Sequence, residues 1–455
     1  MHTDAGSAGH DAPPPDEAAS HAAFLAWLRT HGAHVLAGLK FCRDPQTGWG
    51  LATEEAIPRD TCVMRIPQAL VIYSAACRDA VAGALGVLAP DANAESPAPR
   101  DWVTLYILLQ RLLDTPAANA AQSTLLRHVP YARILPDPIP TPLTYTNAEI
   151  ALLEGTSLFH HIAKRQEATA AAAAGVRRWL AQVGIPERPA WDPLRTAVQE
   201  PRWTALWRWS DDVYGSRSFP ARIAGMDTEE PVLIPGLDSI NHGRGEPVTW
   251  SFETGDVALT LRKDVARAAQ VLNNYGAKSN EELLSAYGFV ERGGPDDVLV
   301  LALASEGGAA QVYYWRREEE EPPAALLAAL AGSGPLGSAP LGSALQGAAG
   351  GGALQHALAD AHAVEALESF VTARQRVFRA TQREVDDAEP WESGSQFAVR
   401  ASVLDVIREY RRGQAFLLDR AVAWTHRRMD ALLDELDALG YEEGGGSRGA
   451  GESGG

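Results

Sequence analysis

The sequence predicts an α+β protein in which a β-rich core is interrupted by a helical insertion and followed by a helical domain. Two segments, 41–72 and 231–290, carry short apolar runs bounded by turn residues, a pattern typical of strands. Apolar residues recur at helical spacing between these segments and again after residue 363. At 455 residues the chain is too long for one ordinary core, so we expect two domains.

The composition is that of a globular protein, with 46% hydrophobic and 22% charged residues. The formal net charge of -18 argues against general nucleic-acid binding and favours basic protein partners. The three cysteines, Cys42, Cys62 and Cys77, fit neither a disulfide framework nor the paired ligands of a zinc site, so we expect a reducing compartment, the cytoplasm or the nucleus. No run approaches the roughly 20 apolar residues that a bilayer requires, and no membrane association is expected.

The first segment is expected to combine a helix with extended chain. Residues 1–21 lack apolar patterning and predict a disordered tail, whereas apolar residues at helical spacing predict a helix over Ala22 to Leu36. Gly48-Trp49-Gly50-Leu51 predicts a tight turn between extended segments. A strand is predicted over Cys62 to Ile66.

The middle of the chain predicts helices. Apolar residues from Trp102 to Leu112 mark one amphipathic helix, and the pair Thr146 and Glu149 predicts the start of another. The alanine-rich run Ala168 to Ala174 is helical by propensity.

The segment 231–290 gathers polar residues around short strands. Asp238, Asn241 and His242 directly follow an apolar run, and buried polar groups need partners. A β-hairpin is predicted from two strands, 248–252 and 257–261, joined by a four-residue turn. Ser279 and Glu282 form a capping box for a helix over 280–287, which puts Tyr275 and Tyr287 at its two ends.

The last third predicts a strand, two long helices and two segments without regular structure. The strand is expected at 298–303 and the helices at 363–381 and 397–436. The Gly/Ala/Ser-rich stretch at about 333–353 predicts a flexible loop, and residues 442–455 a disordered tail.

Together these motifs resemble the SET domain, the S-adenosylmethionine-dependent protein methyltransferase fold. The residues that match are Asp238, Asn241 and His242, the Tyr275-Gly276 pair after a strand, and the Gly48-Trp49-Gly50 motif. The order of residues in the insertion, and Tyr410-Arg411-Arg412-Gly413-Gln414 near the C-terminus, is similar to the Rubisco large-subunit methyltransferase type. The resemblance implies a β-rich SET domain with a pseudoknot-like core, a helical insertion and a separate all-α C-terminal domain.

The resemblance also implies domain boundaries. The expected parts are a SET N-terminal half at 22–97, a helical insert at 98–205, a SET C-terminal half at 206–295 and a helical substrate-binding domain at 296–441.

The resemblance assigns roles to ten residues. S-adenosylmethionine would be bound by Gly48, Trp49, Gly50, Arg217, Asp238, Asn241 and His242, with no metal. Arg217 would lie beside the cofactor carboxylate, although the residue type alone also fits a surface arginine. Tyr275 would be the catalytic residue that orients the target amine. Phe219 and Tyr287 would line the substrate channel, and a plain core position fits them equally well.

The activity that the resemblance implies is methylation of a lysine in a non-histone protein, such as a ribosomal protein, an elongation factor or a Rubisco-like target. The expected partner is this protein substrate, and the enzyme is expected to be a monomer. A protein-histidine methyltransferase is an alternative, for which a polar residue would be expected in place of Phe219. A non-catalytic SET-like interaction module is a second alternative, which predicts loss of Tyr275 or of the Asn241-His242 pair.

Overall fold

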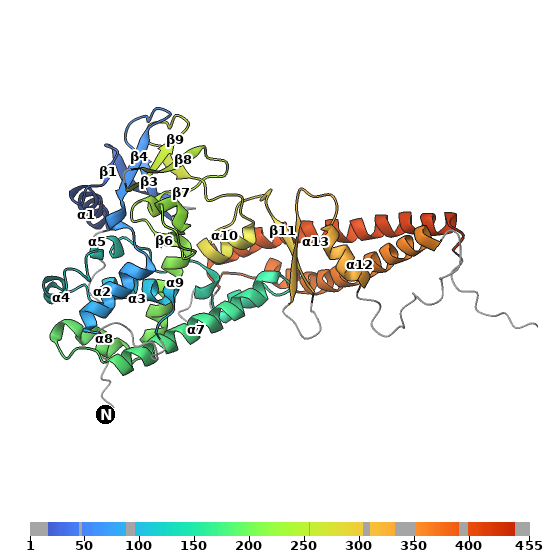
Figure 1. The fold of residues 1–455 in the computed structure, drawn as a ribbon. Coiled ribbons are helices and arrows are strands. Elements are labelled where there is room, and N and C mark those ends of the chain that lie inside the picture. Colours follow the sequence, from blue (N-terminus) through green and yellow to red (C-terminus); the bar gives the residue numbers. More distant parts are fainter. Residues whose placement is uncertain are drawn as a thin grey trace, which may run out of the picture. The chain divides into compact units, whose positions relative to one another are not determined.

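The computed structural model of the protein describes residues 17–44, 48–87, 96–253, 255–303, 310–332, 351–390 and 399–441. They form two compact units, coloured along the chain in Figure 1. Of the described residues, the N-terminal unit contains those up to 144, 163–277 and 286–288, and the C-terminal unit contains 145–162, 278–285 and those from 289 onward. Residues 333–350 of the loop predicted at about 333–353, residues 1–16 of the tail predicted at 1–21, and the tail at 442–455 lie outside the described residues, whereas residues 351–353 begin helix α12 (Gly351–Asp387) and 17–21 begin helix α1 (Glu17–Thr30).

Two four-stranded sheets form the core of the N-terminal unit. One has the order β1-β4-β9-β8, made of His34–Val35 (β1), Cys62–Pro67 (β4), Asp256–Leu261 (β9) and Val248–Glu253 (β8). The other has the order β2-β3-β10-β7, made of Leu39–Asp44 (β2), Gly48–Thr53 (β3), Gln270–Asn273 (β10) and Asn241–His242 (β7). Each sheet therefore joins strands from both predicted halves, which confirms the expected α+β architecture with a β-rich core.

Strand β10 is the element that brings the sequence motifs together. It pairs antiparallel with β3, placing Val271 opposite Leu51, and parallel with β7, placing Asn273 opposite His242. Val271 and Leu51 are fully buried, so apolar burial holds this register. The motifs around Gly50, Asn241 and Tyr275 consequently meet in one sheet.

Helices pack around these sheets. They are α1 (Glu17–Thr30), α2 (Ser74–Leu85), α3 (Pro99–Leu112), α4 (Pro116–Ala121), α5 (Val129–Ala132), α7 (Ser157–Val183, from residue 163 on), α8 (Asp192–Ala197) and α9 (Arg202–Arg217). Helix α3 is almost wholly buried and packs against α2 and α9. A short ladder of β5 (Ser218–Phe219) and β6 (Val232–Leu233) follows α9. The predicted helical insertion is confirmed by these elements.

Three local predictions are wrong. The helix predicted over 22–36 begins earlier, at Glu17, and ends at Thr30, because Gly32 takes a left-handed conformation with φ of 87° and Val35 then joins β1. The turn predicted at 48–51 is part of strand β3. Glu253 and Asp256, predicted to lie in the hairpin turn, instead pair with each other as the ends of β8 and β9.

The C-terminal unit is mainly helical. Its elements are α6 (Asn147–Ala151), α10 (Asn280–Tyr287, up to residue 285), β11 (Val298–Leu303), β12 (Gln311–Arg316), α11 (Ala324–Gly332), α12 (Gly351–Asp387) and α13 (Ala401–Ala438). The capping boxes predicted for α6 and α10 are both present. The strand predicted at 298–303 is β11, and its partner β12 is an addition to the predicted all-α domain. Helices α12 and α13 lie side by side (Figure 1) and bury Leu367, Val371, Leu417 and Leu418.

A buried arginine ties this unit together. The Arg411 side chain is fully buried and donates hydrogen bonds to five acceptors: Leu152 O, Glu154 O, Phe378 O, Thr381 Oγ1 and Gln382 Oε1, at 2.7–3.0 Å. A guanidinium has five N–H donors, so this burial is compensated. The motif around Arg411 thus stabilises the helical unit from within.

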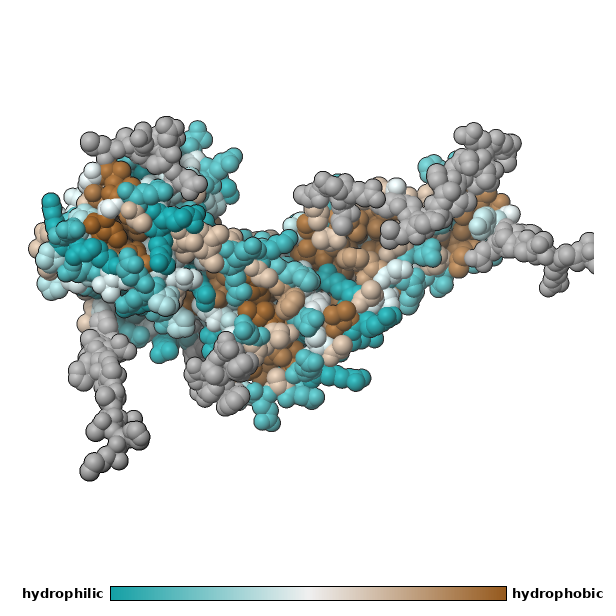
Figure 2. Space-filling view, turned by 90° about the horizontal axis from the view of Figure 1, so that it is seen from below, coloured by the Kyte–Doolittle hydropathy of each residue, from teal (hydrophilic) through white to brown (hydrophobic). Residues whose placement is uncertain are grey.

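The surface of the C-terminal unit exposes several large apolar side chains. Figure 2 shows hydrophobic surface over the part of the unit built from its long helices. The most exposed large apolar residues of the unit are Val312, Tyr314, Val377, Phe416, Leu433 and Leu439. No helix among the described residues is long and apolar enough to cross a membrane.

Candidate active site

Three hydrogen-bond donors hold the Asp238 carboxylate in the turn before β7. The Asp238 carboxylate accepts from the Gly236 amide at 2.9 Å, from the Tyr131 hydroxyl at 2.6 Å and from Arg217 Nη1 at 3.2 Å. Arg217 Nη1 also donates to the Asp238 carbonyl at 3.0 Å. Gly236 takes a φ of 96°, a conformation that favours glycine, which lets the chain turn here against the core.

Burial and neighbouring charges shift the pKa values of the ionisable groups at this turn. Burial lowers the pKa of the Arg217 guanidinium. The nearby Asp238 carboxylate, together with smaller contributions from Tyr131 and Tyr275, outweighs this effect, and the pKa is raised above its usual value. Burial, reinforced by Asp238, raises the pKa of Tyr131 well above the usual range of a phenol. Arg217 is therefore a permanent cation at neutral pH, and Tyr131 is a neutral donor.

Gly50 of β3 and Asn241 of β7 lie in close contact, although β10 stands between their strands in the sheet. Asn241 Nδ2 donates to Gln270 Oε1 at 2.9 Å. A Cβ built on Gly50 would lie 2.4 Å from Asn241 Nδ2 and 2.9 Å from Gln270 Oε1. Only a glycine fits here without displacing these amides.

Tyr275 lies two residues after the end of β10 and is fixed at several points. Its amide donates to His242 Nδ1 at 3.1 Å, so this nitrogen is the unprotonated one. Its ring stacks on His242, with centroids 5.0 Å apart and planes at 25°, and also lies 5.0 Å from the ring of Tyr287. Its hydroxyl donates to Ile240 O at 3.0 Å. The ring and hydroxyl are thereby held in one orientation.

The Tyr275 hydroxyl keeps its proton at neutral pH. Burial raises the pKa of Tyr275 above the usual value of a phenol, against an opposing effect of Arg217. Because the proton is donated to Ile240 O, the lone pairs of the hydroxyl oxygen are available as acceptors. A neutral tyrosine held in this way can orient a donor group but is poorly suited to act as a base.

Two predicted site residues make their ring contacts elsewhere. Phe219 packs against Trp250 of β8, with centroids 5.2 Å apart, and has no ring contact with Tyr275 or Tyr287 among the described residues. Trp49 packs against His21 of α1, with centroids 4.4 Å apart, and His21 stacks on Phe41. The central contacts therefore involve the Asp238 turn, the Gly50–Asn241 contact and the two tyrosines.

The sequence did not single out Tyr131, Gln270 or His21 as part of this region. Tyr131 reaches Asp238 from 107 residues away in the chain, and Gln270 reaches Asn241 only because β10 pairs with β7. No local signal marks either contact. His21 falls within the segment that its composition had predicted to be disordered.

The region has features that fit S-adenosylmethionine. The Ser239 hydroxyl is buried and has no hydrogen-bond partner within the described residues, so it remains available to a ligand. Both hydrogen bonds that Arg217 donates there use Nη1, which leaves its other nitrogens for a carboxylate. The residues that could hold such a cofactor are thus present at the end of α9, on β3 and β7, and on the Asp238 turn.

The comparison with known sequences finds relatives that are named as lysine N-methyltransferases. No protein-family model matches the chain. A segment of 103 residues, 22% of the chain, is 40% identical to the ribosomal lysine N-methyltransferase set10 of Schizosaccharomyces pombe and covers 19% of that protein. A longer segment, 59% of the chain, is 26% identical to the ribosomal lysine N-methyltransferase 1 of Saccharomyces cerevisiae and covers 48% of it. The chain thus spans less than half the length of these relatives.

The comparison of folds covers nearly the whole chain. The SET domain of LSMT, crystallised with lysine and AdoHcy, matches 92% of this chain and 93% of its own with a TM-score of 0.66 at 18% identity. This match confirms the fold predicted from the motifs around Gly50, Asn241 and Tyr275. The chain therefore has the SET fold seen in LSMT, and proteins named as ribosomal lysine N-methyltransferases are among its sequence relatives.

Proposed function

We propose that the protein is an S-adenosylmethionine-dependent protein-lysine N-methyltransferase. The observation that carries the proposal is Tyr275, half-buried just after β10 between His242 and Tyr287, with its hydroxyl bonded to Ile240 O. The names of the relatives, ribosomal lysine N-methyltransferases, support it. The similar SET domain crystallised with lysine and AdoHcy supports the pair of ligands.

Methylation of a lysine requires a neutral amine held in line with the methyl donor. A free lysine has a pKa of about 10.4, so the amine must lose a proton before it can attack. When bound, the cofactor supplies an electrophilic methyl group on a sulfonium sulfur. In-line orientation of this kind accounts for much of the acceleration that enzymes obtain from binding.

Tyr275 orients the amine in this proposal. Its hydroxyl oxygen accepts an N–H of the amine while its own proton stays on the bond to Ile240 O. The nitrogen lone pair then points away from Tyr275. Because burial raises the pKa of Tyr275, the residue acts as a fixed neutral hydrogen-bonding group rather than as the base.

The cofactor-binding residues divide the task. Gly48, Trp49 and Gly50 present strand backbone to the methionine portion, and Arg217 meets the carboxylate with a planar, permanently charged group. Asn241 and His242 bind the adenine side. Asp238 holds Arg217 and the turn before β7 in place.

Phe219 and Tyr287 would line the channel for the target side chain. Tyr287 lies beside Tyr275, which favours this role. An apolar Phe219 packed on Trp250 favours an aliphatic lysine over a polar imidazole, so lysine is preferred to histidine as the target. The substrate class we propose is a non-histone protein of the reducing compartments, in keeping with the names of the relatives and the free cysteines.

The proposal is tested by incubating the purified protein with tritiated S-adenosylmethionine and a fractionated proteome. We expect label on one or a few proteins, and mass spectrometry of the labelled band should find the methyl group on a lysine. Label on a histidine would establish the alternative target. If the protein binds the cofactor but transfers no label to any fraction, the hypothesis of a non-catalytic interaction module replaces the hypothesis of a methyltransferase.

A further inference from the structure

Gln270, at the start of β10, holds the side-chain amide of Asn241 from the neighbouring strand. Asn241 Nδ2 donates to Gln270 Oε1 at 2.9 Å. The sheet order β2-β3-β10-β7 places Gln270 between the strand of Gly50 and the strand of Asn241. A residue to which the sequence motifs assign no role thus contacts one of the residues expected to bind the cofactor.

The register of the sheet places the two side chains on one face. Leu272, two residues after Gln270, pairs with Asn241 of β7. Alternate residues of a strand face the same side, so Gln270, Leu272 and Asn241 share a face. These three residues are half-buried, whereas Val271 and Asn273 on the other face are only 0% and 2% exposed. The Gln270–Asn241 pair consequently lies on the side of β10 that a ligand can reach.

The backbone before Gln270 is fixed by two hydrogen bonds to Thr53 of β3. Thr53 N donates to Ala269 O at 3.1 Å, and Ala268 N donates to Thr53 O at 2.9 Å. Ala268 takes a φ of 63°, in the left-handed region that residues other than glycine rarely occupy. Because these bonds hold the turn in this conformation, Gln270 has a defined position before any ligand binds.

Gly50 confines both amides. A Cβ built on Gly50 would lie 2.4 Å from Asn241 Nδ2 and 2.9 Å from Gln270 Oε1. The two amide groups therefore fill the space that a side chain on β3 would occupy, against the backbone of the Gly48-Trp49-Gly50 motif.

The hydrogen bond distinguishes the two ends of the Asn241 carboxamide. The side-chain oxygen of a glutamine accepts but cannot donate, so it selects the Nδ2 end of Asn241 and directs Oδ1 away from Gln270. Without this acceptor, a half-turn of the Asn241 amide would exchange donor and acceptor while keeping nearly the same shape.

We propose that Gln270 is a positioning residue for S-adenosylmethionine, acting through Asn241, whose carboxamide it holds in the orientation that the cofactor requires. The inference rests on the proposed function, in which Asn241 binds the adenine side of the cofactor. A side chain that is oriented in advance loses less conformational freedom when the ligand binds. Removing Gln270 Oε1 should therefore weaken cofactor binding without removing a direct contact to the cofactor.

The test measures binding of S-adenosylmethionine to the full chain by isothermal titration calorimetry. Gln270→Met keeps the length of the side chain but removes the acceptor, and should weaken binding about tenfold. Gln270→Glu keeps an oxygen that accepts from Asn241 Nδ2, so its affinity should stay within about threefold of the wild type. The matched controls are Gln68→Met and Gln68→Glu, at an exposed position just after β4, and both should bind as the wild type does.

A double-mutant cycle establishes whether Gln270 acts through Asn241. Asn241→Ala alone should weaken binding about tenfold. Adding Gln270→Met to it should change the affinity by less than about twofold, because the group that Gln270 orients is already absent. A direct contact between Gln270 and the cofactor would instead multiply the two losses to about a hundredfold.

Steady-state kinetics separates this role from that of Tyr275. In Gln270→Met the KM for the cofactor should rise about tenfold, while turnover at saturating cofactor should fall by less than about threefold. Tyr275→Phe should show the reverse pattern. A melting curve without cofactor establishes that each variant is folded.

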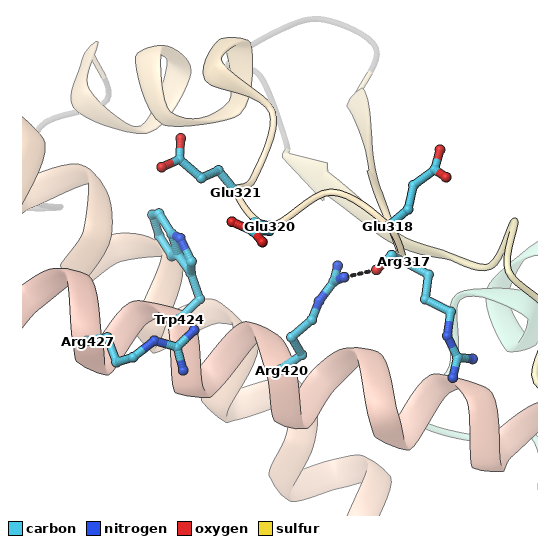
Figure 3. Close-up of a pocket in the computed structure, with 7 residues that line it drawn as sticks. All are labelled: Arg317, Glu318, Glu320, Glu321, Arg420, Trp424 and Arg427. Carbon is cyan, nitrogen blue, oxygen red and sulfur yellow. Dashed lines mark hydrogen bonds between the residues drawn. The ribbon is translucent and has the colours of Figure 1, made fainter.

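The C-terminal unit supplies a further control. It contains a cavity of about 550 Å³ lined by the segment after β12 and by α13 (Figure 3). Arginines and glutamates line this cavity together, and Arg420 donates there to the Arg317 carbonyl. Glu320→Gln changes an exposed carboxylate of the cavity and should leave the affinity for S-adenosylmethionine within about twofold.

Three results would overturn the inference. Equal affinities of Gln270→Met and the wild type would show that Gln270 has no effect on cofactor binding. Equal losses in Gln270→Met and Gln270→Glu would show that the acceptor is not what matters. Multiplied losses in the cycle would make Gln270 a direct contact of the cofactor.

Failure of the proposed function gives a different result. A wild type that binds S-adenosylmethionine but transfers no methyl group would contradict the proposed function and leave the role of Gln270 in place. A wild type that does not bind the cofactor would contradict both.

Discussion

Asn241 Nδ2 donates to Gln270 Oε1 at 2.9 Å, and the two amides together lie against the backbone of Gly50. This contact joins the N-terminal and C-terminal SET segments at the point where three strands of one sheet meet. It also makes Gly50 the residue of the Gly48-Trp49-Gly50 motif whose missing side chain matters most.

Gly50→Ala should therefore damage both stability and cofactor binding. The added Cβ would lie 2.4 Å from Asn241 Nδ2, so the amide must move and its bond to Gln270 is lost. We expect a loss of about 1–3 kcal/mol in unfolding free energy and weaker binding of S-adenosylmethionine by calorimetry. The control is Gly83→Ala in α2, where an added Cβ meets no heavy atom within 4 Å. If Gly50→Ala binds cofactor as the wild type does, the motif does not form part of the cofactor site.

Arg217 should contribute to stability and to cofactor affinity through different atoms. Arg217→Ala leaves the buried Asp238 without its charge partner, which commonly costs about 3–5 kcal/mol. Tyr131 and the Gly236 amide still donate to Asp238, so the loss in unfolding free energy should lie near the lower end of this range, at about 3 kcal/mol.

Arg217→Lys separates the two contributions. A lysine restores the charge but not the planar guanidinium, so melting temperature should recover more than cofactor affinity does. Calorimetry and thermal melts on both variants check this. An unchanged cofactor affinity in a folded Arg217→Ala protein would limit Arg217 to bracing the turn.

The fold and the site were predictable to different degrees. The helix Asn280–Tyr287 was predicted at its observed bounds because its capping box is local. The glycines at 48–50 were misread as a turn, since a strand that must pass close to Asn241 uses the same residue type. Tyr131 and Gln270 were missed because their contacts arise only when distant segments pair.

Asp212 should give the stability a pH dependence that a neutral substitute removes. The carboxylate lies fully buried in α9, accepts from Thr141 Oγ1 at 2.7 Å, and has Arg165 Nη2 at 3.2 Å. Burial raises the pKa of Asp212 from 3.8 to about 6, against the opposing effects of Thr141 and Arg165. The folded state thus favours the protonated form.

The sign follows from this shift. The stability that Asp212 contributes is fully present below about pH 4 and is lost as the pH rises through about 6. Relative to the wild type, Asp212→Asn should gain up to about 3 kcal/mol in unfolding free energy between pH 4 and pH 8. Chemical denaturation at several pH values measures this. A difference between the two proteins that stays constant over this range contradicts the assignment.

Arg411 and Arg412 form a natural pair of test and control in α13. Arg411 is fully buried with five acceptors, whereas the side chain of Arg412 is 70% exposed. Arg411→Met should leave these acceptors without their donor and cost at least about 3 kcal/mol. Arg412→Met should change the unfolding free energy by less than about 1 kcal/mol. Similar losses in both variants would show that Arg411 does not hold the helical unit together.

The central claim rests on the Tyr275 hydroxyl, and the most direct measurement is transfer of tritiated methyl groups to protein by the wild type, Tyr275→Phe and Tyr287→Phe. Tyr275→Phe removes the hydroxyl that donates to Ile240 O, so turnover should fall about 10²-fold to 10³-fold while cofactor affinity stays near that of the wild type. Tyr287→Phe should be milder, or should change the number of methyl groups added. Full transfer by Tyr275→Phe together with its loss in Tyr287→Phe would contradict the account.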